Sequence, residues 1–244
     1  SGFVLGAAFR STGLADRLAQ RISARAPASY RGSVVLLVAI GATTAMLIPS
    51  STVRVIMLVP VAVALAERMG CPSGTRGHCG LVFATIFGTI MPGIAILPAN
   101  VLNLLLSGMT ETLYGHSFSY FQWLSLLGPT YLLLQSLGIV LVILILFPSR
   151  REHRGQAERE PRPEAGRWTW AERRLIWILA GALSMWLTDG LHHISPAWIG
   201  LTAAVICLTP RIGFFAPTGM AAEINWGFLL SIAGILSYVA IVNH

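Results

Sequence analysis

The sequence predicts an all-α polytopic membrane protein, and three observations carry that prediction. Hydrophobic residues make up 55% of the 244 positions, charged residues only 11%, and the mean hydropathy is +0.69. Apolar runs alternate with short segments that hold most of the arginines. The formal net charge of +7 rests entirely on arginine, because the chain has no lysine. This basic charge therefore indicates membrane topology through the positive-inside bias and does not indicate nucleic-acid binding.

A helical hairpin is predicted from Gly32 to Ala66, with both ends on the cytoplasmic side. Two apolar runs, 33–47 and 55–66, flank a break at residues 48–54 that holds a proline and three consecutive hydroxyl residues. Each run is about 12 to 15 residues long, whereas a helix needs roughly 20 residues to cross a bilayer. Arginines stand on both flanks, which places both flanks inside: Arg25, Arg31, Arg68 and Arg76. We therefore expect a re-entrant hairpin, and the alternative is a Pro-Ser kink in an ordinary spanning helix.

The tip of this hairpin is a candidate binding site because it leaves backbone groups unpaired at membrane depth. Non-helical chain is tolerated there only where protein buries it or where it lines a wet cavity. Half-helix N-termini attract anions, and carbonyl and hydroxyl oxygens can hold a small cation. Ser50, Ser51 and Thr52 supply the hydroxyls. Arg54 would be costly in lipid, so we expect it either to bind substrate or to brace the hairpin against backbone carbonyls.

A second break is predicted in the segment Gly80–Leu106, which we expect to cross the membrane outward. Glycines, prolines and an asparagine interrupt this segment: Gly88, Pro92, Gly93, Pro98 and Asn100. A broken helix that faces a hairpin tip is the arrangement in which transporters build sites for substrate and coupling ion. Asn100 and Asn103 could supply amide oxygens to such a site. An interhelical hydrogen bond is the alternative role for Asn103.

The remaining apolar segments alternate consistently between the two sides of the membrane. We expect a cytoplasm-bound helix at 1–9, and an amphipathic helix at 13–22 that lies along the inner interface. An outer loop at 107–120 precedes a clean span, Trp123–Phe147, with Trp123 at the outer interface. An arginine-rich cytoplasmic linker follows, and further helices are predicted at 175–188, 196–209 and from Trp226 onward.

Few other residues suggest chemistry. Asp189, His192 and His193 could serve acid/base catalysis, which makes a membrane-embedded enzyme the rival hypothesis. They are predicted to lie in a short outer loop, where solvated histidines are the usual finding. The three cysteines form no pattern typical of a metal site: Cys71, Cys79 and Cys207.

The order of these pieces resembles the divalent anion/sodium symporter family, which carries dicarboxylates, citrate, tartrate or sulfate. The likeness runs over nearly the whole chain, from Gly2-Phe3 and the stretch Thr12–Arg17 to Ile224–Gly227. Members carry Ser-Asn-Thr at the first hairpin tip, continued in one subgroup by Ala-Arg, and Ser50–Arg54 reads Ser-Ser-Thr-Val-Arg. Members also carry Gly-Thr-Pro-Pro-Asn in the broken helix, where Ile96–Asn100 reads Ile-Leu-Pro-Ala-Asn.

The resemblance implies roles for individual residues. Ser50, Ser51 and the carbonyl of Ile96 would hold a sodium ion, which would act as the coupling ion. A second group would face the anion, with Arg54 and Asn100 beside it: Ser51, Thr52, Leu97 and Pro98. The chain departs from the family pattern twice. Ser51 replaces an asparagine and lacks its amide, and Leu97 replaces a threonine and removes a hydroxyl from the substrate side.

The resemblance also implies what the whole protein does. It implies sodium-coupled, elevator-type secondary transport of small divalent organic or inorganic anions by a homodimer in the lipid bilayer of the bacterial inner membrane. It further implies an inverted-repeat transporter fold, of which this chain would be an internal fragment that lacks the second hairpin. The expected domains are 1–31 (scaffold helix end and interfacial helix), 32–148 (hairpin, broken helix and following span of the transport domain), 149–174 (cytoplasmic linker) and 175–244 (scaffold helices that start the second repeat).

Overall fold

The computed structural model describes residues 2–14, 17, 21, 27, 29–149, 168–192, 194–209, 213–214 and the single positions 227, 230, 231, 233, 234 and 237. Within these residues every regular element is helical, as the sequence predicts, and no strand occurs. Most of the predicted helix from Trp226 and most of the predicted interfacial helix at 13–22 lie outside the described residues. So does most of the linker, residues 150–167.

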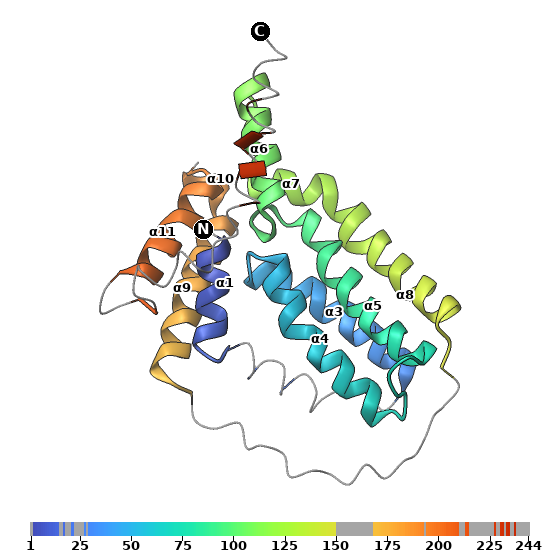
Figure 1. Cartoon of the computed structure of the whole chain (residues 1–244). Coiled ribbons are helices and arrows are strands. Elements are labelled where there is room, and N and C mark those ends of the chain that lie inside the picture. The colour runs from blue at the N-terminus through green and yellow to red at the C-terminus, as the bar shows by residue number, and fades with distance from the viewer. Residues whose placement is uncertain are drawn as a thin grey trace.

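The predicted hairpin region consists of two helices and a short break between them. Helices α3 (Tyr30–Leu47) and α4 (Ser51–Arg68) each have 18 residues, so both are longer than the apolar runs that predicted them. The chain leaves α3 at Ile48, which is extended, and Pro49 cannot continue the helix because it lacks an N–H group. The Ser50 hydroxyl then accepts a hydrogen bond from Val53 N and caps α4. The two helices lie side by side (Figure 1).

Helix α5 (Arg76–Ile90) packs against both arms of the hairpin, and two glycines allow the close approach to α3. A Cβ placed on Gly41 would lie 2.5 Å from the carbonyl oxygen of Gly88. A Cβ placed on Gly88 would lie 2.8 Å from Val38 Cα. Only glycine fits at both positions, and small residues at such crossings are typical of helices that pack in membranes.

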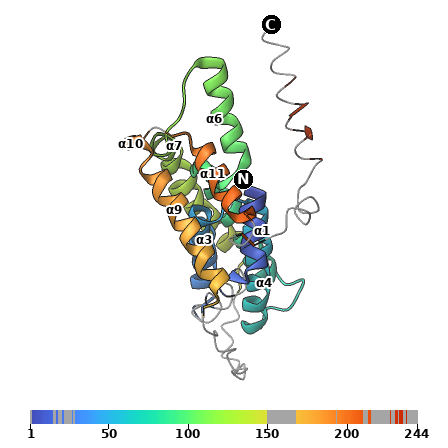
Figure 2. The same cartoon turned by 90° about the vertical axis from the view of Figure 1, so that its left-hand side faces the viewer.

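The second predicted break is confirmed after α5. Two short 3₁₀ segments follow, η1 (Pro92–Ala95) and η2 (Leu97–Ala99), before helix α6 (Val101–Tyr114) begins. The Asn100 side chain caps α6 by accepting a hydrogen bond from Leu102 N. The prediction of an outer loop over 107–120 was wrong for its first half, because α6 runs to Tyr114 and ends at Gly115, whose φ is +66°. Helix α6 projects away from the other helices (Figure 2).

The predicted span Trp123–Phe147 is longer and less regular than expected. Helix α7 (Tyr120–Leu127) begins with a capping box between Ser119 and Gln122. A π-helical segment, η3 (Gly128–Leu134), then leads into α8 (Gln135–Leu146). Pro129 lacks an N–H, so the regular hydrogen-bond ladder fails at this point and widens. The Tyr30 hydroxyl donates to Phe147 O over 2.8 Å and joins the base of α3 to the end of α8.

A second group of helices packs beside the hairpin, on the left in Figure 1. It comprises α1 (Gly2–Ser11), α9 (Trp170–Leu187), the single turn α10 (Asp189–His192) and α11 (Pro196–Leu208). Helix α1 contacts α11 and reaches the hairpin at Gly6, where a Cβ would lie 2.6 Å from Val53 Cγ2. The predicted helices at 1–9 and 196–209 are therefore confirmed within two residues at each end, and that at 175–188 starts at Trp170.

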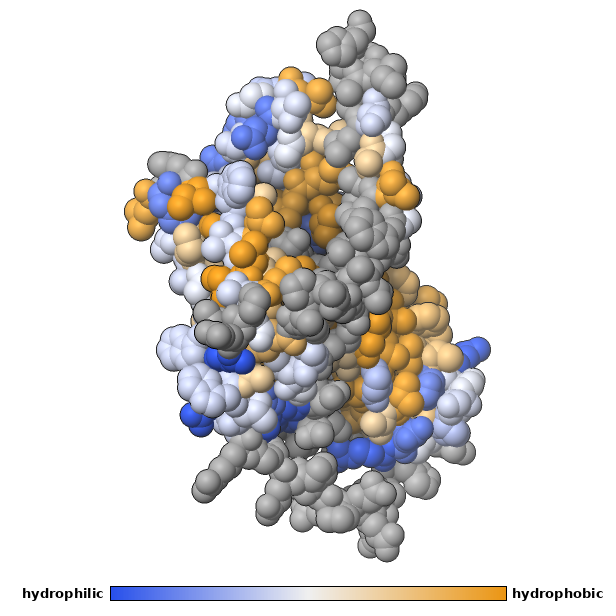
Figure 3. All heavy atoms as spheres, turned by 60° about the vertical axis from the view of Figure 1, so that its left-hand side comes forward, coloured by the Kyte–Doolittle hydropathy of each residue, from blue (hydrophilic) through white to orange (hydrophobic). Residues whose placement is uncertain are grey.

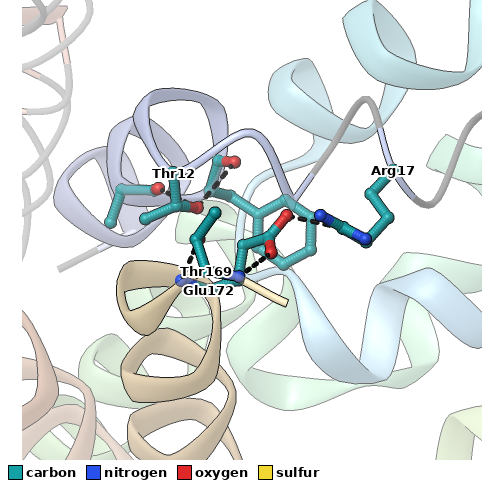
Figure 4. A network of polar contacts seen from close by, with 6 residues as sticks. Thr12, Arg17, Thr169 and Glu172 are labelled. Carbon is teal, nitrogen blue, oxygen red and sulfur yellow. Dashed lines mark hydrogen bonds and ion pairs between the residues drawn. The ribbon is translucent and has the colours of Figure 1, made fainter. Parts of the chain in front are cut away.

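The first turn of α9 is held by a polar network around Glu172 (Figure 4). Its carboxylate accepts hydrogen bonds from Arg17 Nε at 2.7 Å and from Thr169 N at 2.8 Å. Burial by itself raises the pKa of the Glu172 carboxyl. The hydrogen bonds from Arg17 and Thr169 and the charge of Arg17 lower this pKa by more than burial raises it, so the pKa of Glu172 is below its usual value. The side chains of Arg17 and Arg21 also lie over the Trp168 ring.

Three helical segments among the described residues are long and apolar enough to cross a membrane: Tyr30–Leu47, Arg76–Ala95 and Tyr120–Leu146. In Figure 3, hydrophobic residues spread over the middle of the face shown, and strongly hydrophilic residues gather toward its lower edge. Large apolar side chains such as Leu133, Ile145 and Trp177 are more than half exposed. An exposed apolar surface of this kind is typical of a protein that is solvated by lipid.

Candidate functional site at two helix breaks

The hairpin tip and the broken helix meet, and Arg54 joins them. Its Nη1 donates to the carbonyl oxygen of Ile48 at 2.6 Å and to that of Ala99 at 3.0 Å. Ile48 is the last residue before the hairpin break, and Ala99 ends the second 3₁₀ segment. One guanidinium therefore satisfies a carbonyl from each break, which is the spatial relation that the sequence predicts for the two discontinuities.

The other arm of Arg54 closes the connection. Its Nη2 donates to Ser51 Oγ at 3.1 Å and to Thr89 O, in the last turn of α5, at 3.3 Å. The side chain has 0% exposure, and Nε makes no hydrogen bond with any residue that the structure describes. A Cβ on Gly93 would lie 2.6 Å from Nη2, so this glycine leaves room for the guanidinium. Of the two predicted roles for Arg54, the geometry matches the brace against backbone carbonyls.

No carboxylate contacts Arg54 among the residues that the structure describes. Its hydrogen-bond partners are carbonyl and hydroxyl oxygens, and the two buried acids among the described residues, Glu172 and Asp189, are engaged with other groups. A guanidinium remains charged in proteins. Within the described residues, the junction of the two breaks therefore carries a buried positive charge that dipoles compensate, which favours an anion in its vicinity.

Two further side chains satisfy the backbone of the broken helix. Asn103 Nδ2 donates to Gly93 O at 3.0 Å and to Ile96 O at 2.9 Å. Trp123 Nε1 donates to Ile94 O at 2.9 Å. Trp123 is only 2% exposed, so its indole lies within the protein and supports the break, while its predicted depth at the outer interface stays a prediction. Asn103 was expected to pair between helices or to bind in the site, and it bonds the backbone of its own broken helix.

The predicted sodium ligands are all engaged in hydrogen bonds. Ser50 Oγ accepts from Val53 N, and Ser51 Oγ accepts from Arg54 Nη2. The Ile96 carbonyl accepts from both Asn103 Nδ2 and Ala99 N at 2.9 Å, so both of its lone pairs are used. A sodium ion at Ile96 O would have to displace one of its two donors, and at Ser51 Oγ it would lie beside the Arg54 guanidinium, so the arrangement does not fit such an ion as it stands.

The predicted substrate-binding residues divide into two sets. Leu97 and Pro98 are buried beneath the surface of the break. Thr52 is exposed in the first turn of α4, and Asn100 is half-buried at the N-terminus of α6. The N-termini of α4 and α6, with their free N–H groups, therefore lie at the two breaks. The helix dipoles favour an anion there. Thr89 was not predicted, and its buried carbonyl carries no sequence signal.

The residues of the rival enzyme hypothesis have structural partners. The Asp189 carboxylate is 5% exposed and accepts a hydrogen bond from Tyr120 N at 2.8 Å, at the start of α7. His192 places Nε2 2.9 Å from Met185 O, and its Nδ1 accepts from Ile194 N at 3.0 Å. His193 lies outside the described residues. Among the described residues no group of histidine, cysteine and acidic side chains could hold a metal ion.

Comparison with known proteins points to transport. The sequence profile of a citrate transporter family (CitMHS) matches residues 1–244, the whole chain. A protein described only as a membrane protein, from Cupriavidus necator strain H16, is 24% identical over 230 residues. That alignment covers 93% of this chain and 45% of the relative, so the chain spans less than half the length of the protein that it matches.

Proposed function

The chain belongs to the citrate transporter family, and from this premise we propose that it forms part of a secondary transporter for small multivalent anions. The substrate class is citrate or a related anion: dicarboxylate, tartrate or sulfate. The observation that supports the proposal most directly is Arg54, whose buried charge joins two helix breaks and has no carboxylate partner among the described residues. A net positive junction between two helix N-termini is suited to a polyanion.

The family consists of transporters, so the chain is not an enzyme. The contacts of Asp189 agree, because a carboxylate that accepts a hydrogen bond from a helix N-terminus has a capping role. The single described histidine of the rival hypothesis, His192, likewise contacts backbone.

Several finer features belong to the same proposal. The hairpin α3–α4 would enter and leave the membrane on the cytoplasmic side, since Arg31, Arg68 and Arg76 all flank its base. The full-length protein would contain an inverted second repeat and would work as an elevator-type homodimer. The hairpin and the helices through α8 would move, and α1 and α9–α11 would stay with the scaffold. We place it in the bacterial inner membrane.

The anion would bind on the side of the breaks where Thr52 and Asn100 are accessible. The N–H groups at the start of α4 and α6 and the positive charge of Arg54 would attract its carboxylates. Ser51 would contribute through Arg54, because its hydroxyl already accepts from that guanidinium. Leu97 and Pro98 would shape the floor of the site, since both are buried. Sodium remains the proposed coupling ion of the full-length protein.

Uptake by the full-length protein in liposomes tests this proposal. Labelled citrate, succinate, tartrate and sulfate are offered with an inward sodium gradient, with a proton gradient, or with neither. We expect accumulation of at least one of these anions to depend on one of the gradients. Gradient-independent leak, or uptake of cations in place of anions, would remove the proposed function.

A matched pair of variants locates the site. Thr52→Leu should abolish uptake, because leucine places a bulky apolar group at the tip. The melting temperature should stay unchanged, because Thr52 is exposed. Thr43→Leu is the control, since Thr43 is equally an exposed threonine of the hairpin but lies within α3, away from the break. Equal uptake by the two variants would show that the anion binds elsewhere.

A further inference from the structure

The oxygens around Arg54 form the kind of ligand set that a small cation uses. The guanidinium contacts two main-chain carbonyls at the tip and the break, Ile48 O and Ala99 O, a third carbonyl in α5, Thr89 O, and one hydroxyl, Ser51 Oγ. Carbonyl and hydroxyl oxygens freed by broken helices are the groups that hold coupling ions in transporters. Here they all point at a side chain that is itself a cation.

The predicted sodium site overlaps this set and is compromised by it. Ser51 is common to both, and its hydroxyl accepts from Arg54. The third predicted ligand, Ile96 O, accepts two hydrogen bonds, one of them from Asn103. A metal ion beside the guanidinium would place two positive charges in a buried site that has no carboxylate among the described residues. The local charge balance therefore permits one cation at this junction, and the chain supplies it.

We propose that the guanidinium of Arg54 is a built-in cation that replaces a sodium ion at the junction of the hairpin tip and the broken helix. The charge of this guanidinium organises the oxygens of both breaks in every transport cycle. Because the group is part of the chain, it cannot dissociate as a bound ion does. Arg54 is thus a positioning residue. It holds the hairpin tip against the break and contributes positive charge toward the anion. Any coupling ion of the full-length protein then binds outside the set formed by Ser50, Ser51 and Ile96.

The planar fork of arginine explains why this residue type stands here. One arm of the fork donates to Ile48 O and Ala99 O, and the other donates to Ser51 Oγ and Thr89 O. A lysine ammonium has three donors at one point and cannot reach both pairs of oxygens in the same geometry. Gly93 completes the arrangement, because any side chain there would meet Nη2 at 2.6 Å.

The test removes the side-chain cation and asks whether a free cation takes its place. Arg54→Ser in the full-length protein leaves the oxygens and opens room for an ion. Thermal unfolding of the purified variant is followed with increasing sodium chloride, and choline chloride holds the ionic strength constant. We expect the midpoint of the variant to rise by several degrees with sodium, since a bound ligand stabilises the folded state. The midpoint should rise likewise with millimolar guanidinium, which fits the vacated place.

The wild-type protein and Arg31→Ser set the comparison. Arg31 is exposed near the start of α3, so its removal should create no cation site. The additional sodium response must appear in Arg54→Ser and be absent from both of these proteins. An equal sodium response in all three proteins overturns the proposal, and so does an Arg54→Ser protein that melts at the wild-type temperature without any added cation.

Uptake provides a second arm, and this arm alone depends on the proposed transport function. Arg54→Ser should lose at least about tenfold in uptake without added guanidinium and recover part of it with guanidinium. Arg54→Lys should remain impaired, because it keeps the charge but loses the fork. Cation-dependent unfolding without any uptake in the wild type would retain the inference and reject the transport function. Full uptake by Arg54→Ser would overturn the inference itself.

Discussion

Replacing Gly41 with alanine should separate the hairpin from the broken helix. The added Cβ would lie 2.5 Å from Gly88 O, 2.7 Å from Gly88 C and 2.8 Å from Thr89 N, all of them backbone atoms. Ordinary contact begins at 3.4 Å, so α3 and α5 would have to move apart by about 0.9 Å. Backbone atoms in the middle of a helix cannot rotate away as a flexible side chain does. The strain therefore falls on the whole interface.

The size of the effect follows from two opposing terms. Overpacking of a tight contact costs about 2–3 kcal/mol at a site where backbone must shift. Alanine in place of glycine in a helix returns about 1 kcal/mol through lower backbone entropy in the unfolded state. The net destabilisation of Gly41→Ala is therefore about 1–2 kcal/mol, which lowers the melting temperature by about 2–8 °C.

Gly138→Ala is the matched control, because Gly138 lies within α8 and a Cβ there would meet nothing within 4 Å. This variant should melt at or slightly above the wild-type temperature. The melting of both variants is measured on protein purified in detergent, with uptake measured in parallel. The difference between the two melting temperatures isolates the overpacking. If Gly41→Ala melted as high as Gly138→Ala, the close approach of α3 and α5 would not exist in the protein.

Two further predictions concern the topology and the polar network of α9. Cysteines placed at positions 31 and 68, in a background without the three native cysteines, should both react with an impermeant reagent from the cytoplasmic side; reaction from opposite sides would reject the re-entrant hairpin. The Glu172 carboxyl has a folded pKa below its unfolded value, so its stabilising contribution is complete above the usual carboxyl range and is lost as the pH falls through the lowered pKa. Glu172→Gln should therefore reduce the loss of stability on acidification, and an unchanged pH dependence of unfolding would contradict the ion pair with Arg17.

The sequence allowed the two breaks to be predicted because proline and glycine act locally. Pro49 ends α3 wherever that helix lies, and Pro92 follows the end of α5 in the same way. The hydroxyl and amide caps at Ser50 and Asn100 are equally local, since each accepts from an N–H group two or three residues ahead. Helix existence and helix breaks follow from such short-range rules.

The contacts that hold the two breaks together could not be predicted, because they join residues far apart in the chain. Trp123 donates to Ile94 O across 29 positions, and Asp189 accepts from Tyr120 N across 69. In the sequence, a tryptophan at a span end favours the interface, and an acid in a short loop favours solvent. Both residues are buried beside a backbone group that needs a partner: the carbonyl of Ile94 in the break and the N–H of Tyr120 at the start of α7. Unpaired backbone groups thus decide the side-chain positions, a demand that is visible only once the helices are packed.

The same requirement explains how the hairpin and the broken helix can act as one body. Backbone groups that are unpaired in lipid cost several kcal/mol each, so the carbonyls of both breaks must find donors within the protein. Arg54 on α4 satisfies carbonyls on three different segments, and Asn103 on α6 satisfies two more. Sliding the tip past the break would expose these carbonyls together, which makes separation far more costly than moving the two as a unit. By contrast, the second group of helices meets the hairpin and the breaks largely in a shared hydrophobic cluster, together with the hydrogen bond from Tyr120 N to Asp189. Apolar packing can shift without leaving carbonyls unpaired, so we propose that a moving domain would separate from the second group of helices along this contact.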